Sequence, residues 1–420
     1  MVGFLALQCL IDLLVAWISL MIGLGIFALI LSILCSAAFL HNAKEAFRDA
    51  WKSTCESTGS PTMHVPVGHN FLLHSLIFEG PCTSNDVRVE INGNIVGESD
   101  PLEWQCNDCD CPKWIMFSKV NGLSITGSGT INGQGSNWWA GTWKQKHARF
   151  SIFGLSNFDA KACKKKPTAL TIYHSTHVNV SGLTFVDSPQ MHVAVESSTW
   201  VYMSNLSIKA PEDSPNTDGI HIQGSKYVKI SHSLIGTGDD CISIGPGSSY
   251  INISTITCGP GHGISIGSLG KGERNETVEN VHVSGVVLNR TSNGVRIKTW
   301  QGGMGYARNI VFEDISVNEA DRPIIIDQYY CDADEQCKNQ TSAVKVSNIT
   351  YNRIFGTSQR SNAINFACSK TVACTNIFMS NIGIDSIGDN ELTTSFCQNA
   401  YGIIRGQVIP NVPCLVAYTQ

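Results

Sequence analysis

Four short segments repeat one pattern: Asp218-Gly-Ile-His-Ile, Asp240-Cys-Ile-Ser-Ile, His262-Gly-Ile-Ser-Ile and Asn293-Gly-Val-Arg-Ile. The first three begin 22 residues apart. This period is typical of a solenoid, in which residues one repeat apart lie above one another in stacked coils. Because neighbouring strands lie about 4.8 Å apart, we expect Asp218, Asp240 and His262 to form a ladder on one face of the molecule.

Weaker copies extend the repeat: Thr168-Ala-Leu-Thr-Ile and Met191-His-Val-Ala-Val come before it, and Arg322-Pro-Ile-Ile-Ile comes after it. Alternation of aliphatic and variable residues within each copy indicates a half-buried strand. Gly, Asn, Ser and Pro separate these strands from further short strands, as expected at corners. No ten-residue helical pattern intervenes, so the sequence predicts an all-β fold, a right-handed single-stranded parallel β-helix.

One helix is expected at the start of this body. Ala43, Phe47, Trp51 and Cys55 recur at every fourth position, which places them on one face of an amphipathic helix. A β-helix needs its first coil covered, so we expect this helix to be a cap. The chain has 420 residues with 38 glycines, which suits one long solenoid over residues 41–420 after a hydrophobic segment, 1–40. The net charge of -5 gives no general affinity for nucleic acid.

Sixteen cysteines and seven Asn-x-Ser/Thr sequons favour a secretory protein, because that route oxidises thiols and glycosylates asparagine. The sequons begin at Asn179, Asn205, Asn252, Asn275, Asn289, Asn339 and Asn348. We expect five local disulfides: Cys55–Cys82, Cys241–Cys258, Cys331–Cys337, Cys368–Cys374 and Cys397–Cys414. The cluster Cys106-Asn-Asp-Cys-Asp-Cys lacks a second ligand pair at zinc spacing, so a metal site there is the less favoured interpretation.

Four motifs carry a resemblance to a known family. They are Ser214-Pro-Asn-Thr-Asp-Gly, Gly236-Thr-Gly-Asp-Asp-Cys, Gly261-His-Gly and Arg296-Ile-Lys. At these motifs the chain resembles the polygalacturonases, glycoside hydrolase family 28, and most closely the plant members. Each motif is weak alone, but four in order and in register with the coils are a strong signal. The resemblance runs from about residue 43 to 414 and departs at the start, where hydrophobic sequence replaces the Tyr-Gly-Ala and Gly-Asp-Gly type segment of the family.

The resemblance implies hydrolysis of α-1,4-galacturonosyl bonds in homogalacturonan, a pectic polysaccharide, by a monomer with no metal or organic cofactor. Glycosidic hydrolysis needs an acid for the leaving oxygen and a carboxylate that activates water or attacks carbon. Asp218, Asp239 and Asp240 place three carboxyl groups in two neighbouring coils, and crowding predicts that one retains its proton at mildly acidic pH. The resemblance implies that Asp239 is the general acid, that Asp218 and Asp240 hold and activate the water, and that the product is inverted. Capping of turns is the alternative role for an aspartate at a corner.

His262 follows Asp240 in the ladder, where a hydrogen bond could adjust carboxyl protonation, and the resemblance implies a supporting catalytic role. Arg296 and Lys298 are two apart on a strand and point to the same face, so we expect them to bind the carboxylate of a uronic acid. A solvated strand face is the alternative. The resemblance also assigns a sugar contact to Tyr330, and Asn216 in the first motif is expected to bind substrate.

Other functions remain open at this stage. A rhamnogalacturonan hydrolase shares the scaffold and the acids, and a catalytically impaired wall-binding protein would share the fold. A calcium-dependent pectate lyase is disfavoured by the histidine and paired-acid motifs. Endo or exo cutting and tolerance of methyl esters are not predicted.

The first segment gives conflicting signals about location. Residues 13–40 are apolar and long enough to span a bilayer, but no Lys or Arg precedes Lys44 as in an ordinary signal. The basic residues after the segment would keep the body cytosolic by the positive-inside tendency, against the cysteines and sequons. Three options remain: a cleaved signal, an anchor with the catalytic domain outside, and an incorrectly assigned segment. We expect secretion to the cell wall, with membrane contact through 13–40 only if the segment is uncut.

Overall fold

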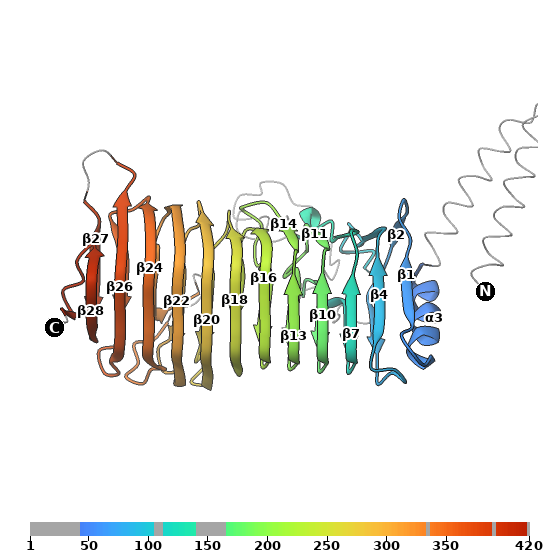
Figure 1. The fold of residues 1–420 in the computed structure, drawn as a ribbon, viewed down its shortest axis with the longest axis horizontal. Coiled ribbons are helices and arrows are strands. Elements are labelled where there is room, and N and C mark those ends of the chain that lie inside the picture. The colour runs from blue at the N-terminus through green and yellow to red at the C-terminus, as the bar shows by residue number, and fades with distance from the viewer. Residues whose placement is uncertain (1–42, 105–111, 140–164, 333–336, 389–391, 418–420) are drawn as a thin grey trace, which may run out of the picture.

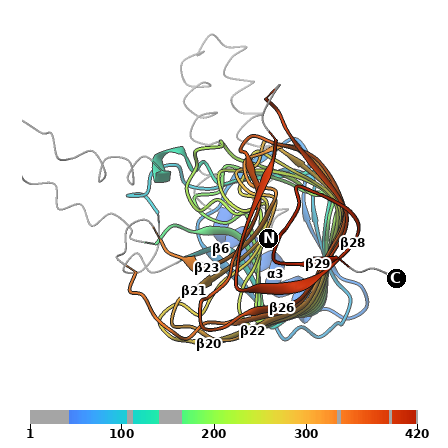
Figure 2. The ribbon, with the colours of Figure 1, turned by 90° about the vertical axis from the view of Figure 1, so that its left-hand side faces the viewer.

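The structure is a computed structural model that describes residues 43–104, 112–139, 165–332, 337–388 and 392–417. The chain winds into an elongated stack of coils, with helix α3 (Ala43–Glu56) at one end and β28 at the other (Figure 1). Viewed from the end, the strands of successive coils superimpose (Figure 2). Nearly all described residues in regular structure are in parallel strands, so the predicted right-handed parallel β-helix is confirmed.

One sheet holds eleven parallel strands in chain order within the described residues. They are β3 (Leu76–Glu79), β6 (Lys113–Ser118), β9 (Thr168–Tyr173), β12 (Val193–Glu196), β15 (Ile220–Gln223), β17 (Ile242–Ile244), β19 (Ile264–Leu269), β21 (Val295–Trp300), β23 (Ile324–Tyr330), β25 (Asn362–Ala367) and β27 (Thr394–Gln398). We call this the ladder sheet, because it contains every copy of the repeat identified in the sequence.

The remaining strands form the outer sheet, which wraps the other faces of each coil. The early coils use two short strands: β1 (Thr62–Val65) and β2 (Asn70–Leu72), β4 (Val87–Ile91) and β5 (Asn94–Val96), β7 (Asn121–Thr126) and β8 (Thr130–Asn132), β10 (Thr176–Ser181) and β11 (Thr184–Val186), β13 (Thr199–Ser204) and β14 (Ser207–Lys209). Later coils use one longer strand: β16 (Lys226–Gly236), β18 (Ser248–Cys258), β20 (Asn275–Asn289), β22 (Met304–Ala320), β24 (Lys345–Ser358), β26 (Cys374–Ser386) and β28 (Ala400–Ile409), followed by the short β29 (Val416–Ala417).

The register of the ladder sheet follows the sequence repeat. Ile220 pairs with Ile242, Ile242 with Ile264, and Ile264 with Val295. All four side chains are fully buried. Complete burial of such a side chain stabilises the fold by roughly 1.5–3 kcal/mol relative to exposure, so a slip of register would be costly. The repeat therefore determines which residues stack.

The predicted cap helix is confirmed, and it extends one residue further, to Glu56. Phe47 and Trp51 are buried against the first coils, and the Trp51 ring meets Phe78 and Phe117 edge-on, with centroids 5.4 Å apart in both pairs. Trp51 Nε1 also donates to the Glu79 carbonyl at 3.1 Å. The apolar face of α3 thus covers the open end of the solenoid.

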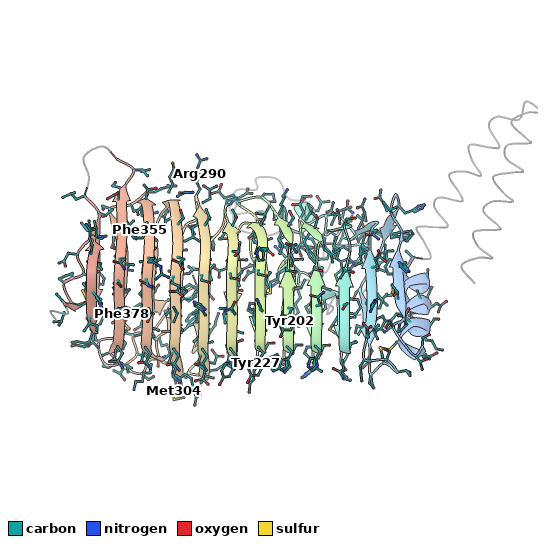
Figure 3. The ribbon with its side chains drawn as sticks, viewed as in Figure 1. Tyr202, Tyr227, Arg290, Met304, Phe355 and Phe378 are labelled. Atoms are coloured by element: carbon teal, nitrogen blue, oxygen red, sulfur yellow. A yellow bond between two sulfur atoms is a disulfide. The ribbon has the colours of Figure 1, made fainter. Side chains whose placement is uncertain are left out.

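One corner of the outer sheet carries a neutral side-chain ladder. The rings of Trp200, Tyr227 and Tyr250 stack at centroid separations of 4.2 and 4.8 Å. In later coils an amide ladder follows, in which Asn309 Nδ2 donates to Asn280 Oδ1 at 3.2 Å. Figure 3 shows Tyr227 near the lower ends of the strands. Because like groups stack on like groups here, this corner ladder holds neighbouring coils in register.

All five expected disulfides are present: Cys55–Cys82, Cys241–Cys258, Cys331–Cys337, Cys368–Cys374 and Cys397–Cys414. The cluster that begins at Cys106 and the hydrophobic residues 13–40 lie outside the described residues. Within the part of the chain that the structure describes, no helix is long and apolar enough to cross a membrane.

Candidate active site

The predicted ladder forms where three consecutive turns enter the ladder sheet. Asp218, Asp240 and His262 each lie two residues before a strand, at the starts of β15, β17 and β19. Backbone hydrogen bonds stack the turns: Gly219 N–H donates to the Asp240 carbonyl at 2.9 Å, and His262 N–H donates to the Asp239 carbonyl at 2.8 Å. The three coils therefore present their acidic and imidazole groups side by side.

Close packing of two loops positions the acids. Gly238 lies so near the loop before Asp218 that a Cβ atom would meet the Ser214 carbonyl oxygen at 2.1 Å. Buried Thr217 joins the loops, since its Oγ1 accepts from Gly238 N–H at 3.1 Å and donates to the Ser214 carbonyl at 2.9 Å. A side chain at position 238 would push Asp239 away from Asp218.

Asp240 is held as an anion by two cations. Its Oδ1 accepts from Arg296 Nη2 at 2.8 Å and from Ser265 Oγ at 2.6 Å, and its Oδ2 accepts from Lys298 Nζ at 2.8 Å. Burial alone would raise the pKa of this carboxyl, but the charges of Lys298 and Arg296 outweigh it and hold the pKa well below its usual range. The sequence predicted that both cations bind a substrate carboxylate; in this structure they also neutralise Asp240.

Asp218 has the opposite character. Its side chain is buried, and Ser243 Oγ donates to its Oδ2 at 2.6 Å. Burial, together with the negative charges of Asp239 and Asp240, raises the pKa of Asp218 to about 7. The sequence predicted that crowding leaves one carboxyl protonated at mildly acidic pH, and in the free protein this group is Asp218.

Asp239 is half-buried, in contrast to its two buried neighbours, and it pairs with His262. His262 Nδ1 lies 3.0 Å from Asp239 Oδ1, which also accepts from Asp240 N–H at 2.8 Å. The hydrogen bond to Asp239 raises the pKa of His262. The sequence placed His262 beside Asp240, but its ring binds Asp239 instead, because Ser265, Arg296 and Lys298 already occupy both oxygens of Asp240.

Asp239, Asp240 and His262 carry groups that can ligate a metal ion. One ligand atom each from Asp239, Asp240 and His262 lies within 4.8 Å of the others. A metal ion would have to compete with Arg296 and Lys298, which already bring two positive charges to Asp240. The donor set therefore favours the internal ion pairs over a divalent cation.

The remaining predicted residues lie at different distances from this centre. The Tyr330 ring is 5.3 Å from Lys298 Nζ and packs edge-on against Trp300, so the structure brings Tyr330 to the cationic side of the site. Asn216 is exposed in a left-handed backbone conformation, with φ of 59°, two residues before Asp218. Among the described residues, no hydrogen bond or ion pair joins the Asn216 side chain to the three acids.

Three polar residues were missed in the sequence: His221, Ser243 and Ser265. Each lies three positions after a ladder residue, and the pairs His221 with Ser243 and Ser243 with Ser265 are in register. Arg296 occupies the same position in the next coil. The repeat itself carried this signal, because these residues alternate with the buried aliphatic positions of the four segments.

All of these motifs fall inside a region with known relatives. The family model of glycosyl hydrolases family 28 matches residues 55–405. The chain belongs to this family. A family member from Arabidopsis thaliana, named a probable polygalacturonase, is 42% identical over 88% of this chain and 80% of that protein. A polygalacturonase of Persea americana is 45% identical over 86% of this chain and 74% of that protein.

A solved hydrolase structure also resembles this fold. The endo-xylogalacturonan hydrolase from Aspergillus tubingensis superposes with a TM-score of 0.70 at 25% identity, covering 85% of this chain and 95% of that one. The similarity to the glycosyl hydrolases of family 28 therefore includes the solenoid as well as the motifs.

Proposed function

We propose that this family 28 glycosidase hydrolyses the α-1,4-galacturonosyl bonds of pectic polygalacturonan in the plant cell wall. Plant relatives named polygalacturonases support the substrate class. The single observation that carries the proposal is the pair Arg296 and Lys298, which lies within hydrogen-bond distance of the acid cluster. A cationic pair at this place recognises a sugar that carries a carboxylate, as every galacturonate residue does.

In the proposed mechanism Asp239 is the general acid. It is the least buried of the three carboxyl groups, and its Oδ1 is occupied by His262 and by Asp240 N–H. Its Oδ2 is therefore the oxygen that takes up a proton when substrate binds and passes it to the glycosidic oxygen. His262 orients this carboxyl and stabilises the charge that remains after the proton leaves.

Asp218 and Asp240 are proposed to hold the water. The water donates one hydrogen bond to the Asp218 oxygen that does not face Ser243, and the ionised Asp240 accepts a proton from the same water. When a substrate carboxylate draws Arg296 and Lys298 toward itself, Asp240 becomes a stronger base at the moment of attack. Methyl-esterified substrate lacks this charge and should be a poor substrate.

Inversion at the anomeric carbon is part of this proposal and is supported by the family resemblance. Inverting enzymes usually separate their carboxyl groups by about 6.5–9.5 Å. Here ligand atoms of Asp239 and Asp240 lie within 4.8 Å, so the spacing by itself does not predict inversion. The anomeric configuration of the first product, measured by proton NMR, decides the question.

A reducing-end assay tests the activity directly. Purified protein should release reducing ends from polygalacturonic acid and far fewer from its fully methyl-esterified form, and Asp239→Asn is the matched inactive control. Equal rates on the two substrates would contradict the role of Arg296 and Lys298. Preference for rhamnogalacturonan would favour that hydrolase, and binding without product would favour a wall-binding protein. Loss of activity with EDTA, restored by calcium, would favour a lyase.

We also propose that residues 41–420 act as a monomeric catalytic domain outside the cell. The five disulfides support an oxidising compartment. Five sequon asparagines are exposed: Asn205, Asn275, Asn289, Asn339 and Asn348. In plant cells, a glycosidase-sensitive protein that carbonate extracts from membranes is the expected result. A carbonate-resistant glycoprotein would indicate an anchor, and an unglycosylated cytosolic product would contradict both.

A further inference from the structure

A row of four polar side chains runs beside the catalytic ladder on β15, β17, β19 and β21. In order, the row is His221, Ser243, Ser265 and Arg296, all paired in register. Both serines are buried, and they lie between an imidazole on one side and a guanidinium on the other. Through its serine, Asp218 is connected to the imidazole of His221, and Asp240 is connected to the guanidinium of Arg296.

Each serine binds the acid of the preceding coil with the same geometry. Ser243 Oγ lies 2.6 Å from Asp218 Oδ2, and Ser265 Oγ lies 2.6 Å from Asp240 Oδ1. Arg296 Nε donates to Ser265 Oγ at 3.0 Å. Because arginine can only donate and a hydroxyl has one proton, the Ser265 hydroxyl must point at Asp240, which suits a permanent anion.

The hydrogen bonds that lead from Asp218 through Ser243 to His221 have no such fixed direction. Ser243 Oγ lies 2.8 Å from His221 Nδ1, and a ring nitrogen can either donate or accept. When Asp218 is ionised, His221 Nδ1–H donates to Ser243, and the serine hydroxyl donates to Asp218. When Asp218 is protonated, its O–H donates to Ser243, the hydroxyl donates to Nδ1, and Nε2–H donates to Gln223 Oε1, 3.2 Å away.

We propose that Ser243 and His221 are positioning residues that hold Asp218 in place in both of its protonation states. This inference rests on the proposed function, in which Asp218 orients the attacking water. The hydrogen bonds from Asp218 through Ser243 to His221 can reverse while these three side chains stay in place. When Nδ1 carries the proton, only the Gln223 amide turns, so that its NH2 donates to Nε2. The hydrogen bonds of Asp240 cannot reverse, because arginine only donates. Retention of Asp218 geometry through titration is what a water-holding carboxyl near its own pKa requires.

The groups around His221 favour a neutral imidazole ring. Burial lowers the pKa of His221, while Glu196 on β12 and Asp240 act in the opposite direction. Lys113 on β6 forms an ion pair with Glu196, which compensates that charge. Asp218 itself faces Asp239, Asp240 and Lys298. Its backbone carbonyl accepts from His192 Nδ1, whose buried ring has a pKa lowered to about 4 and is neutral at working pH.

Kinetics on polygalacturonic acid against pH test the proposal. Ser243→Ala should lower kcat by about tenfold with little change in KM, as expected for loss of one strong hydrogen bond to a carboxyl. The pH limb of Asp218 should move upward, because the Ser243 hydrogen bond lowers that pKa. Ser243→Thr restores the hydroxyl and should recover part of kcat. Ser225→Ala is the matched control and should have the kinetics of the parent, because this buried serine follows β15 and its hydrogen bonds are to backbone groups.

A spectroscopic readout separates this inference from the proposed function. With 15N-labelled histidine, the His221 ring nitrogens, assigned from the His221→Gln variant, should change tautomer as Asp218 titrates. Ser243→Ala should abolish that change. A parent protein with no hydrolytic activity would overturn the proposed function and leave this titration to decide the positioning role. A parent-like pH profile and ring titration in Ser243→Ala would overturn the inference.

Discussion

Asp218 and Asp240 occupy the same place in consecutive coils, yet their carboxyl groups behave in opposite ways. Both are buried, and both accept a hydrogen bond of 2.6 Å from a serine of the next coil. Asp240 meets Arg296 and Lys298, whereas Asp218 meets two negative neighbours and reaches a neutral imidazole through its serine. One pKa is therefore lowered and the other is raised to about 7.

The comparison teaches that a repeat can place two identical residues while the adjoining coils give them different chemistry. Burial can raise a carboxyl pKa by up to about 3–5 units, and a nearby opposite charge lowers it by about 1–3. Two cations are enough to reverse the effect of burial at Asp240. At Asp218 the negative charges of Asp239 and Asp240 add to the effect of burial and outweigh the positive charge of Lys298.

The largest expected effect comes from Asp239, because neither Asp218 nor Asp240 can replace it as the general acid. Asp239→Asn should lower kcat by about 100- to 10,000-fold, the usual contribution of a general acid. Its circular dichroism and melting temperature should stay near those of the parent, because the amide is isosteric and half-exposed. Turnover within a few-fold of the parent would contradict the assignment of Asp239.

The sharpest test of the comparison is the stability of the two matched variants, Asp240→Asn and Asp218→Asn. Loss of the Asp240 charge leaves buried Lys298 and half-buried Arg296 without their partner, and breaking a buried ion pair typically costs about 3–5 kcal/mol. Asp218→Asn replaces a carboxyl that is already neutral below about pH 7, so unfolding at pH 5 should change far less. Both should lose activity. Equal losses of unfolding free energy in denaturant titrations would break the comparison.

The cations of Asp240 should also determine substrate affinity. Arg296→Ala and Lys298→Ala are each expected to raise KM roughly tenfold or more, because a hydrogen bond to a charged group contributes about 1.5–3 kcal/mol. A lower kcat should accompany this, because a substrate whose carboxylate is no longer held lies less precisely over the catalytic acids. Steady-state kinetics on oligogalacturonates measure both. An unchanged KM in both variants would show that Arg296 and Lys298 only form ion pairs with Asp240 and do not bind substrate.

The smallest expected effect is the pH dependence of stability that comes from Asp218. Its folded-state pKa is raised from 3.8 to about 7, so between these values the unfolded chain binds fewer protons than the folded one. Stability from this group therefore falls as pH rises from about 4 to 7. Asp218→Asn removes this term, and its unfolding free energy should decline less over that range. A steeper decline than in the parent would mean that folding lowers the pKa of Asp218 and would contradict its assignment as raised.

Much of the scaffold could be predicted from local patterns. The 22-residue spacing of the repeats predicted the β-helix and its ladder, because a parallel coil returns each residue above its copy. The four-residue spacing from Ala43 to Cys55 predicted the cap helix, and short separations along the chain suggested all five disulfides. These features depend on backbone periodicity, which the order of residues expresses directly.

The sequence by itself therefore determined the solenoid and brought Asp218, Asp239, Asp240 and His262 to one end of three strands. Only the tertiary structure decided that His262 pairs with Asp239, and that Arg296 and Lys298, 56 and 58 residues beyond Asp240, bind it. Side-chain direction and burial depend on neighbours in other coils, and protonation depends on the sum of their charges. The spacing of residues within one segment does not reveal the summed charge of the neighbouring coils. Asp218 and Asp240 are therefore alike in sequence and differ in protonation only in the folded structure.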